Sequence, residues 1–175
     1  MPDRKTSKKP VLIFMGSEND HEVMREAVLI LEQFAVPCEM RVSSAHRSPK
    51  RTIALAEKAA RQGTKIIIAG AGAAAHLAGV IAAHTTLPVI GVPLDSSPLK
   101  GLDALLSTLQ MPAGVPVATM AVGKAGARNA AILAIEILAL HDARLRAKLA
   151  RYKKKLAQSV EQKERLLRKS ANKSD

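Results

Sequence analysis

The chain has 175 residues and a formal net charge of +12, with 47% hydrophobic residues but only 2% aromatic ones. This length favours a single domain. A core of Ala, Val, Ile and Leu leaves few aromatic side chains on which a nucleic-acid base or a flavin could stack. The lone Cys38 excludes an intramolecular disulfide and a site with several cysteine ligands, and it suits a reducing compartment.

The positive charge lies at the two ends of the chain. Residues 10–142 contain 11 basic and 11 acidic residues, whereas residues 1–9 contain 4 and 1, and residues 143–175 contain 12 and 3. Because charge runs are usually solvated helix faces, we expect no nucleic-acid partner despite the basic tail. An RNA contact through residues 144–155 is the alternative. The start of the chain has no apolar signal segment and no run of 18 apolar residues occurs, so we expect a cytoplasmic protein with no membrane partner.

Apolar runs and helical patterns alternate along the chain. Asp20 is expected to cap the first helix, Pro49 to start the second and Gly63 to end it. The helix at residues 125–140 is apolar nearly all round, which predicts that it is buried. The strands are predicted at residues 11–15, 38–42, 65–69, 88–92 and 117–122, and the helices at 20–34, 49–61, 73–83, 102–110 and 125–140.

This alternation predicts an α/β protein, a flavodoxin-like three-layer α/β/α sandwich around a five-stranded parallel sheet. Beyond it, apolar residues recur every three to four positions between Leu145 and Val160, which predicts a C-terminal amphipathic helix. That helix either folds back on its own domain or lies on another subunit. We expect a flexible N-terminus at 1–9, the α/β domain at 10–142, an amphipathic helix making an oligomer contact at 143–168, and a disordered tail at 169–175.

Candidate binding groups follow the first two predicted strands, at the sheet edge where open α/β folds bind ligands. The segment Gly16-Ser17-Glu18-Asn19-Asp20 fits either an anion site at a helix start or an ordinary turn. The segment Ser44-Ala45-His46-Arg47 follows the second strand. A single loop histidine or arginine usually has no such role, but the two segments together suit a phosphorylated small molecule. Arg47 would hold phosphate as a fork and His46 would act as acid or base.

A third segment, Gly70-Ala71-Gly72-Ala73-Ala74-Ala75-His76, matches the looser dinucleotide pattern G-x-G-x-x-A. It follows the third strand rather than the first, so we interpret its glycines as allowing a ligand to approach the backbone. His76 either binds that ligand or caps the local structure. No histidine pair has the spacing of a metal site, so we expect no metal, and Lys124 lies outside any phosphate-binding loop of the Walker type.

In their serial order these segments resemble the N5-carboxyaminoimidazole ribonucleotide mutase family. The resemblance implies a flavodoxin-like fold, a homo-octamer with active sites near subunit interfaces, and a cofactor-free isomerase of purine biosynthesis. The carbamate of the substrate would lose CO2, and C4 of the aminoimidazole would then attack that CO2. The matching text, within about residues 10–145, is Met15-Gly16-Ser17-x-x-Asp20, Ser44-Ala45-His46-Arg47, Ala69-Gly70-Ala71-Gly72, Ala74-Ala75-His76-Leu77, Gly79, Pro88-Val89, Gly91-Val92-Pro93, Gln110-Met111-Pro112, Gly114-x-Pro116-Val117 and Gly123-Lys124-Ala125.

The resemblance also implies residue roles. His46 would be catalytic, Arg47 would bind phosphate with Ser17 and Ser44, and Asp20 would bind the ribose. The backbone of Gly70, Ala71 and Gly72 and the side chain of His76 would form the pocket for the carboxylate and CO2. The remaining expected substrate contacts are Asn19, Ala45 and Ala73. Asn19, Ala73 and Ala78 stand where the family usually has serine, glycine and proline. The alternatives are the related animal-type carboxylase, which takes free CO2, and a flavodoxin-like nucleotide-binding module.

Overall fold

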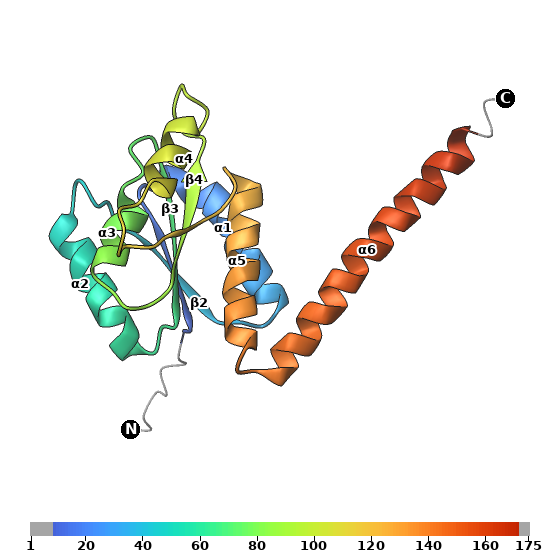
Figure 1. The fold of residues 1–175 in the computed structure, drawn as a ribbon, viewed down its shortest axis with the longest axis horizontal. Helices are drawn as coiled ribbons and strands as arrows, with labels where there is room; N and C mark the ends of the chain where they lie inside the picture. Colours follow the sequence, from blue (N-terminus) through green and yellow to red (C-terminus); the bar gives the residue numbers. More distant parts are fainter. Residues whose placement is uncertain (1–8, 172–175) are drawn as a thin grey trace. The chain divides into compact units, whose positions relative to one another are not determined.

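A computed structural model describes residues 9–171 (Figure 1). Its strands pair in the order β2-β1-β3-β4-β5, all parallel, which confirms the predicted flavodoxin-like sheet. Because β1 pairs with both β2 and β3, the strand order reverses at β1, and ligands bind beside such a reversal in open α/β sheets. The strands are β1 (Val11–Met15), β2 (Cys38–Val42), β3 (Ile66–Gly72), β4 (Val89–Leu94) and β5 (Ala118–Thr119).

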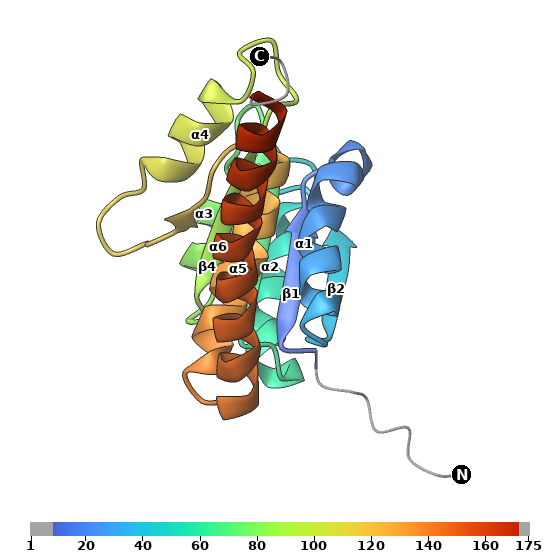
Figure 2. The same cartoon turned by 90° about the vertical axis from the view of Figure 1, so that its right-hand side faces the viewer.

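Helices cover both faces of the sheet. α2 and α3 lie on one face, and α1 and α5 on the other (Figure 1, Figure 2). The chain divides into two compact units between Ile135 and Glu136, within α5. The helices are α1 (His21–Gln33), α2 (Pro49–Ala59), α3 (Leu77–Ala83), α4 (Leu102–Leu109), α5 (Lys124–Ala139) and α6 (Ala143–Ala171), with single 3₁₀ turns η1 (Glu18–Asp20) and η2 (Ala60–Gln62).

The core lies on the two faces of the sheet, which alternate residue by residue along each strand. Leu12 and Phe14 of β1 point to the α2–α3 side, where they join a buried cluster with Ala56 and Ile81. The next residue, Ile13, is fully buried as well. Both faces of β1 are therefore covered, which explains its unbroken apolar run.

Two predicted boundaries around the third segment are wrong. Strand β3 continues to Gly72, because Gly70, Ala71 and Gly72 pair with residues 92–94 of β4. Helix α3 begins at Leu77 rather than at Ala73, whose φ of +51° is incompatible with a helix. The glycines therefore end a strand instead of forming a loop. The fifth strand is also shorter than predicted, since it pairs with β4 only at residues 118 and 119.

The predicted helix ends are confirmed at α2 and corrected at α1. Pro49 occupies the first turn of α2, and Gly63, with a φ of +90°, ends the following turn η2. Asp20 makes no side-chain cap to α1. Its carboxylate instead accepts a hydrogen bond from the Ser17 N–H at 2.9 Å, within the capping box of η1.

Helix α5 is buried on one side rather than all round. Ala127, Ala130 and Ala134 are fully buried, whereas Arg128 is exposed and pairs with Glu26 of α1 at 2.7 Å. A helix that covers one face of a sheet buries only the stripe facing it. The predicted burial of α5 all round is therefore wrong, and the exposed stripe is held to α1 by an ion pair.

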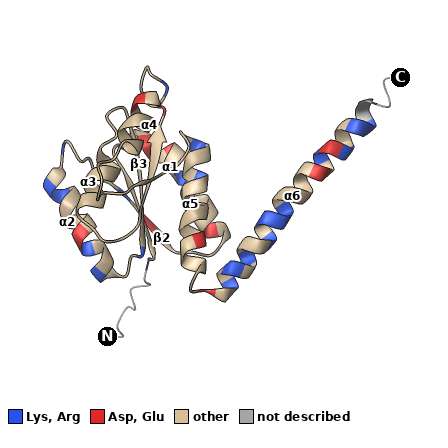
Figure 3. Ribbon diagram, viewed as in Figure 1, with Lys and Arg blue, Asp and Glu red and all other residues tan. Residues whose placement is uncertain are grey.

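The second unit contains the end of α5, a turn at residues 140–142 and α6. Asp142 caps α6, because its Oδ1 accepts hydrogen bonds from the backbone N–H groups of Arg144 and Leu145 at 2.9 and 3.0 Å. α6 is amphipathic and basic along much of its length (Figure 3). It continues to Ala171, past the predicted end at residue 168. Residues 1–8 and 172–175 of the predicted flexible termini lie outside the described residues.

Within the described part of the chain, none of the helices combines the length and the apolar composition that a membrane crossing needs.

Candidate active site

A cavity of about 310 Å³ lies at the carboxyl ends of β1, β2 and β3. It is therefore located where the strand order of the sheet reverses. The loops after β1 and β2, the end of β3 with the turn after it, and the loop after β4 all contribute to its wall. The lining residues are Gly16, Ser17, Asp20, Ser44, Ala45, His46, Arg47, Ala71, Gly72, Ala73, Ala74, Leu77 and Ser96.

Most of the predicted site residues meet at this cavity, and three do not line it. Asn19 is exposed and donates its backbone N–H to the Ser17 hydroxyl at 3.3 Å. Gly70 is buried inside β3. His76 does not line the cavity itself but contacts His46, which does. The predicted residues that line the cavity are Ser17, Asp20, Ser44, Ala45, His46, Arg47, Ala71, Gly72 and Ala73.

The loop after β1 is held to the neighbouring strand, which fixes Ser17 and Asp20. The Gly16 N–H donates to the Gly70 carbonyl at 3.1 Å. The Asp20 side chain is almost fully buried, and this desolvation raises the pKa of its carboxyl above the ordinary value of 3.8. Hydrogen bonds from the Ser17 and Gly16 backbone and the charge of Arg47 partly oppose that rise. A carboxylate held in this way is a fixed acceptor for ligand hydroxyl groups.

The loop after β2 is anchored by Ser43 and reaches across to the loop after β1. The buried Ser43 hydroxyl shares a 2.8 Å hydrogen bond with the Thr52 hydroxyl of α2. The Ser44 hydroxyl accepts the Arg47 N–H at 3.1 Å, and the Arg47 guanidinium donates through Nη2 to the Gly16 carbonyl at 3.2 Å. Arg47 thus joins the two loops while its side chain stays exposed at the cavity.

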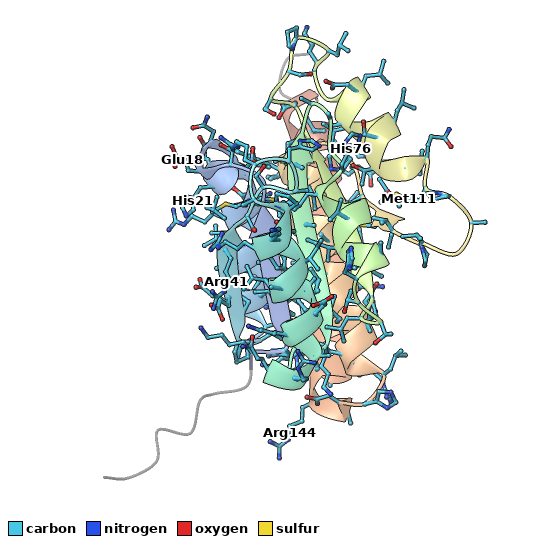
Figure 4. All side chains as sticks on the ribbon, turned by 90° about the vertical axis from the view of Figure 1, so that its left-hand side faces the viewer. Glu18, His21, Arg41, His76, Met111 and Arg144 are labelled. Atoms are coloured by element: carbon cyan, nitrogen blue, oxygen red, sulfur yellow. The ribbon has the colours of Figure 1, made fainter. Side chains whose placement is uncertain are left out.

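Two histidines from different loops form a pair at this end of the sheet. The His46 Nε2 and His76 Nδ1 atoms are 2.9 Å apart, and the rings meet edge to face with centroids 5.0 Å apart. His76 lies among the loops at the upper end of the molecule in Figure 4, as does Glu18. A hydrogen bond between two ring nitrogens requires one protonated and one bare nitrogen. The pair therefore offers a proton donor and a proton acceptor side by side.

Gly70 and Gly72 of β3 make room for the side chains of Met24 and Ser96. A Cβ at Gly70 would lie 2.2 Å from Met24 Sδ of α1, so the absence of a side chain at Gly70 leaves room for that methionine. A Cβ at Gly72 would lie 1.7 Å from the Ser96 hydroxyl oxygen. Gly72 therefore lets Ser96 approach the cavity. Sequence reasoning missed Ser96, although its place directly after β4, beside β3, is the signal that could have found it.

The assembled site suits acid–base chemistry on a phosphorylated molecule. The hydroxyl and guanidinium groups of the cavity wall can donate to phosphate, and the histidine pair can give and take a proton. Among the described residues no group of three His, Cys, Asp or Glu side chains is arranged to hold a metal ion.

Comparison with known proteins points to one family. Residues 10–159 match the family model described as AIR carboxylase. The N5-carboxyaminoimidazole ribonucleotide mutase of Pyrococcus horikoshii is 52% identical over 162 residues, which cover 92% of this chain and 90% of that protein. The mutase of Bacillus subtilis is 53% identical over 148 residues, covering 85% and 91%. The crystal structure of Treponema denticola PurE superposes with a TM-score of 0.79 at 27% identity, covering 87% of this chain and 94% of that one.

Proposed function

The chain belongs to the AIR carboxylase family, and from this premise we propose that it is a mutase of purine biosynthesis. It converts N5-carboxyaminoimidazole ribonucleotide to 4-carboxyaminoimidazole ribonucleotide. The observation that carries this proposal is the position of His46 on the cavity wall, next to Arg47 and in contact with His76.

The reaction needs one proton to be given and one to be taken. Protonation of N5 by His46 lets the carbamate N–C bond break, which releases CO2 and leaves the amine. The C4 carbon then attacks CO2 to form the new C–C bond, and the neutral imidazole accepts the proton from C4. No proton or carbon is gained or lost overall. A single imidazole can serve in both steps because its charged form gives a proton and its neutral form accepts one.

His76 completes this proposed chemistry as the partner of His46. When one ring of the pair donates, the other must present a bare nitrogen, so the contact holds the ring orientation of His46 and couples its tautomer to that of His76. The cavity keeps CO2 beside C4, so recapture is faster than escape, which is catalysis by proximity.

The binding groups are distributed around the cavity by type. We assign the phosphate to Ser17, Ser44 and Arg47, which all line the cavity. We assign the ribose hydroxyls to Asp20, whose carboxylate is fixed by the Ser17 N–H. We assign the base and the CO2 to the remaining predicted lining residues, which are Ala45, Ala71, Gly72 and Ala73.

Two alternatives have different substrates. The animal-type carboxylase would act on aminoimidazole ribonucleotide and free CO2, and a binding module would turn over neither compound. The names of the related proteins favour the mutase. The test is to supply the purified protein with the carbamate ribonucleotide, or with aminoimidazole ribonucleotide plus bicarbonate, without ATP. Efficient conversion of the carbamate supports the mutase, and conversion of the second mixture alone would assign the carboxylase.

We further propose a homo-octamer located in the cytoplasm, with residues 10–142 as the mutase domain and α6 as an oligomer contact. Exposed leucines support the oligomer. Leu102, Leu106 and Leu109 of α4 are 56%, 48% and 54% exposed, and in α6 Leu156 is 50% exposed. Apolar stripes of this kind are typical of surfaces that bind another protein. The reduced thiol of Cys38 is compatible with the cytoplasm.

A further inference from the structure

A second cavity of about 360 Å³ adjoins the first one at the carboxyl ends of β1 and β2. It shares Gly16, Ser17, Ser44 and Arg47 with the first cavity. It is also lined by Arg51, which lies in the first turn of α2 and which neither the sequence patterns nor the family resemblance assigns to the site. The shared residues make the two cavities neighbouring parts of one site.

From these positions we propose that Arg51 is a further phosphate-binding residue, which holds the 5′-phosphate of the substrate together with Arg47. This inference rests on the proposed function, because it places the base of the substrate in the first cavity and the phosphate in the second.

The two guanidinium groups are oriented by equivalent contacts. Arg47 donates through Nη2 to the Gly16 carbonyl just after β1. Arg51 donates through Nη1 to the Val42 carbonyl at the end of β2, at 2.5 Å. One N–H group of each guanidinium is therefore used on the backbone, and most of the others remain available for a ligand. Both arginines are exposed, and among the described residues neither forms a salt bridge with a carboxylate.

The serine hydroxyl groups that line this cavity with the two arginines indicate where a phosphate would bind. The Ser17 and Ser44 oxygens each accept a backbone N–H, so each hydroxyl hydrogen is free to donate to a phosphate. The Ser48 hydroxyl differs, because it already donates to the Ser44 carbonyl at 3.0 Å. The donors available to an anion are thus Ser17, Ser44 and the two guanidinium groups, and all of them line the second cavity.

The charge of this cavity favours a dianion. Two arginines face one acidic residue, Glu18, which is exposed to solvent. Solvent and salt weaken the repulsion from an exposed carboxylate. A guanidinium fork matches two phosphate oxygens, whereas a lysine ammonium acts as a point charge. Arg51 should therefore bind phosphate better than a lysine at the same position.

The test measures binding of inorganic phosphate to the full chain at fixed, low ionic strength by phosphorus NMR. The variants are Arg51→Ala, Arg51→Lys and Arg47→Ala, with Lys50→Ala as the matched control. Lys50 is an exposed cation in the same helical turn that lines neither cavity. We expect Arg51→Ala to raise the Kd about three- to tenfold, as for one charge-assisted contact in water, and Arg51→Lys to raise it less. Lys50→Ala should leave the Kd within about twofold, since its charge is screened.

Equal Kd values for Arg51→Ala and wild type, or equal losses for Arg51→Ala and Lys50→Ala, would overturn the inference. The KM for the carbamate ribonucleotide gives a second readout, and Arg51→Ala should raise KM while kcat changes little. If wild type binds phosphate through Arg51 but does not turn over the carbamate, the proposed function fails, whereas the assignment of Arg51 as a phosphate-binding residue stands. If wild type is an active mutase and Arg51→Ala has unchanged Kd and KM, the inference alone fails.

Discussion

Among the residues that line the cavity, Ala73 has a backbone conformation that suits glycine better. Its φ is +51°, in the left-handed region that favours glycine. A left-handed conformation costs a residue with a Cβ about 1–2 kcal/mol. Glycine would remove this cost but would increase the entropy of the unfolded chain, which offsets about 0.4–1 kcal/mol.

We therefore predict that Ala73→Gly raises the free energy of unfolding by about 0.5–1 kcal/mol, measured by urea denaturation. The control is Ala74→Gly, at the next lining position, whose φ is not positive. That change should lower stability by up to about 1 kcal/mol. Equal losses in both variants would show that the conformation of Ala73 carries no cost.

Asp20 connects site geometry with the pH dependence of stability. Burial raises the pKa of its carboxyl in the folded protein above the ordinary 3.8, so the folded state binds the proton more tightly than the unfolded state. The stability that Asp20 contributes is therefore fully present below pH 3.8 and is lost as pH rises through the folded pKa.

Asp20→Asn removes this titration and keeps an oxygen that can accept the Ser17 N–H. We predict that the stability of Asp20→Asn relative to wild type increases between about pH 3.5 and about pH 7 in urea titrations. The same variant should bind the substrate less tightly, because the ribose would lose its charged acceptor. A relative stability that falls over this range would contradict the cause given for the pKa shift.

At the scale of elements, α4 presents its leucines outward. Leu102, Leu106 and Leu109 are spaced so that they share one side of the helix, and each is about half exposed. The opposite side is buried, since Thr108 packs over Gly91 of β4, where a Cβ would lie 2.4 Å from the threonine methyl. A charge on the outward side should therefore leave the fold of the chain intact and disturb subunit contacts.

We predict that Leu106→Glu sediments as a smaller species than wild type while the circular dichroism spectrum of the chain is retained. A glutamate buried in an apolar interface would lose its water without gaining a partner. Gln110→Glu, at an exposed polar position of the same segment, is the matched control and should sediment like wild type. If both variants sediment like wild type, α4 makes no subunit contact.

Several elements were predictable because local signals agree with the tertiary structure. The bounds of β1 were predicted because it is a short apolar run, and those of β2 because Pro37, which cannot continue a helix, stands just before Cys38. The end of β3 was not, since an Ala- and Gly-rich segment fits a strand end, a turn and a helix equally well, and only pairing with β4 decides. The contact of the Asp20 side chain was predicted wrongly for a similar reason. The local sequence fits a cap of α1, but the carboxylate accepts the Ser17 N–H within η1 instead.

At the scale of the whole molecule, the parallel sheet explains how residues far apart in the sequence form one site. The convergence of the loops after β1, β2 and β3 follows from parallel topology and was predictable. The contact between His46 and His76, 30 residues apart, was not, because it depends on side-chain orientations that no spacing rule determines. Ser96 was missed because its approach to the cavity depends on the absence of a side chain at Gly72 on the adjacent strand.

The central claim is that the His46 imidazole gives and then takes the proton in one cavity. The most direct measurement compares wild type with His46→Asn for formation of 4-carboxyaminoimidazole ribonucleotide from the carbamate, at saturating substrate, with substrate binding measured in parallel. Loss of a general acid–base group predicts a fall in kcat of at least about a hundredfold with binding retained. A His46→Asn variant that turns over at nearly the wild-type rate would contradict the account.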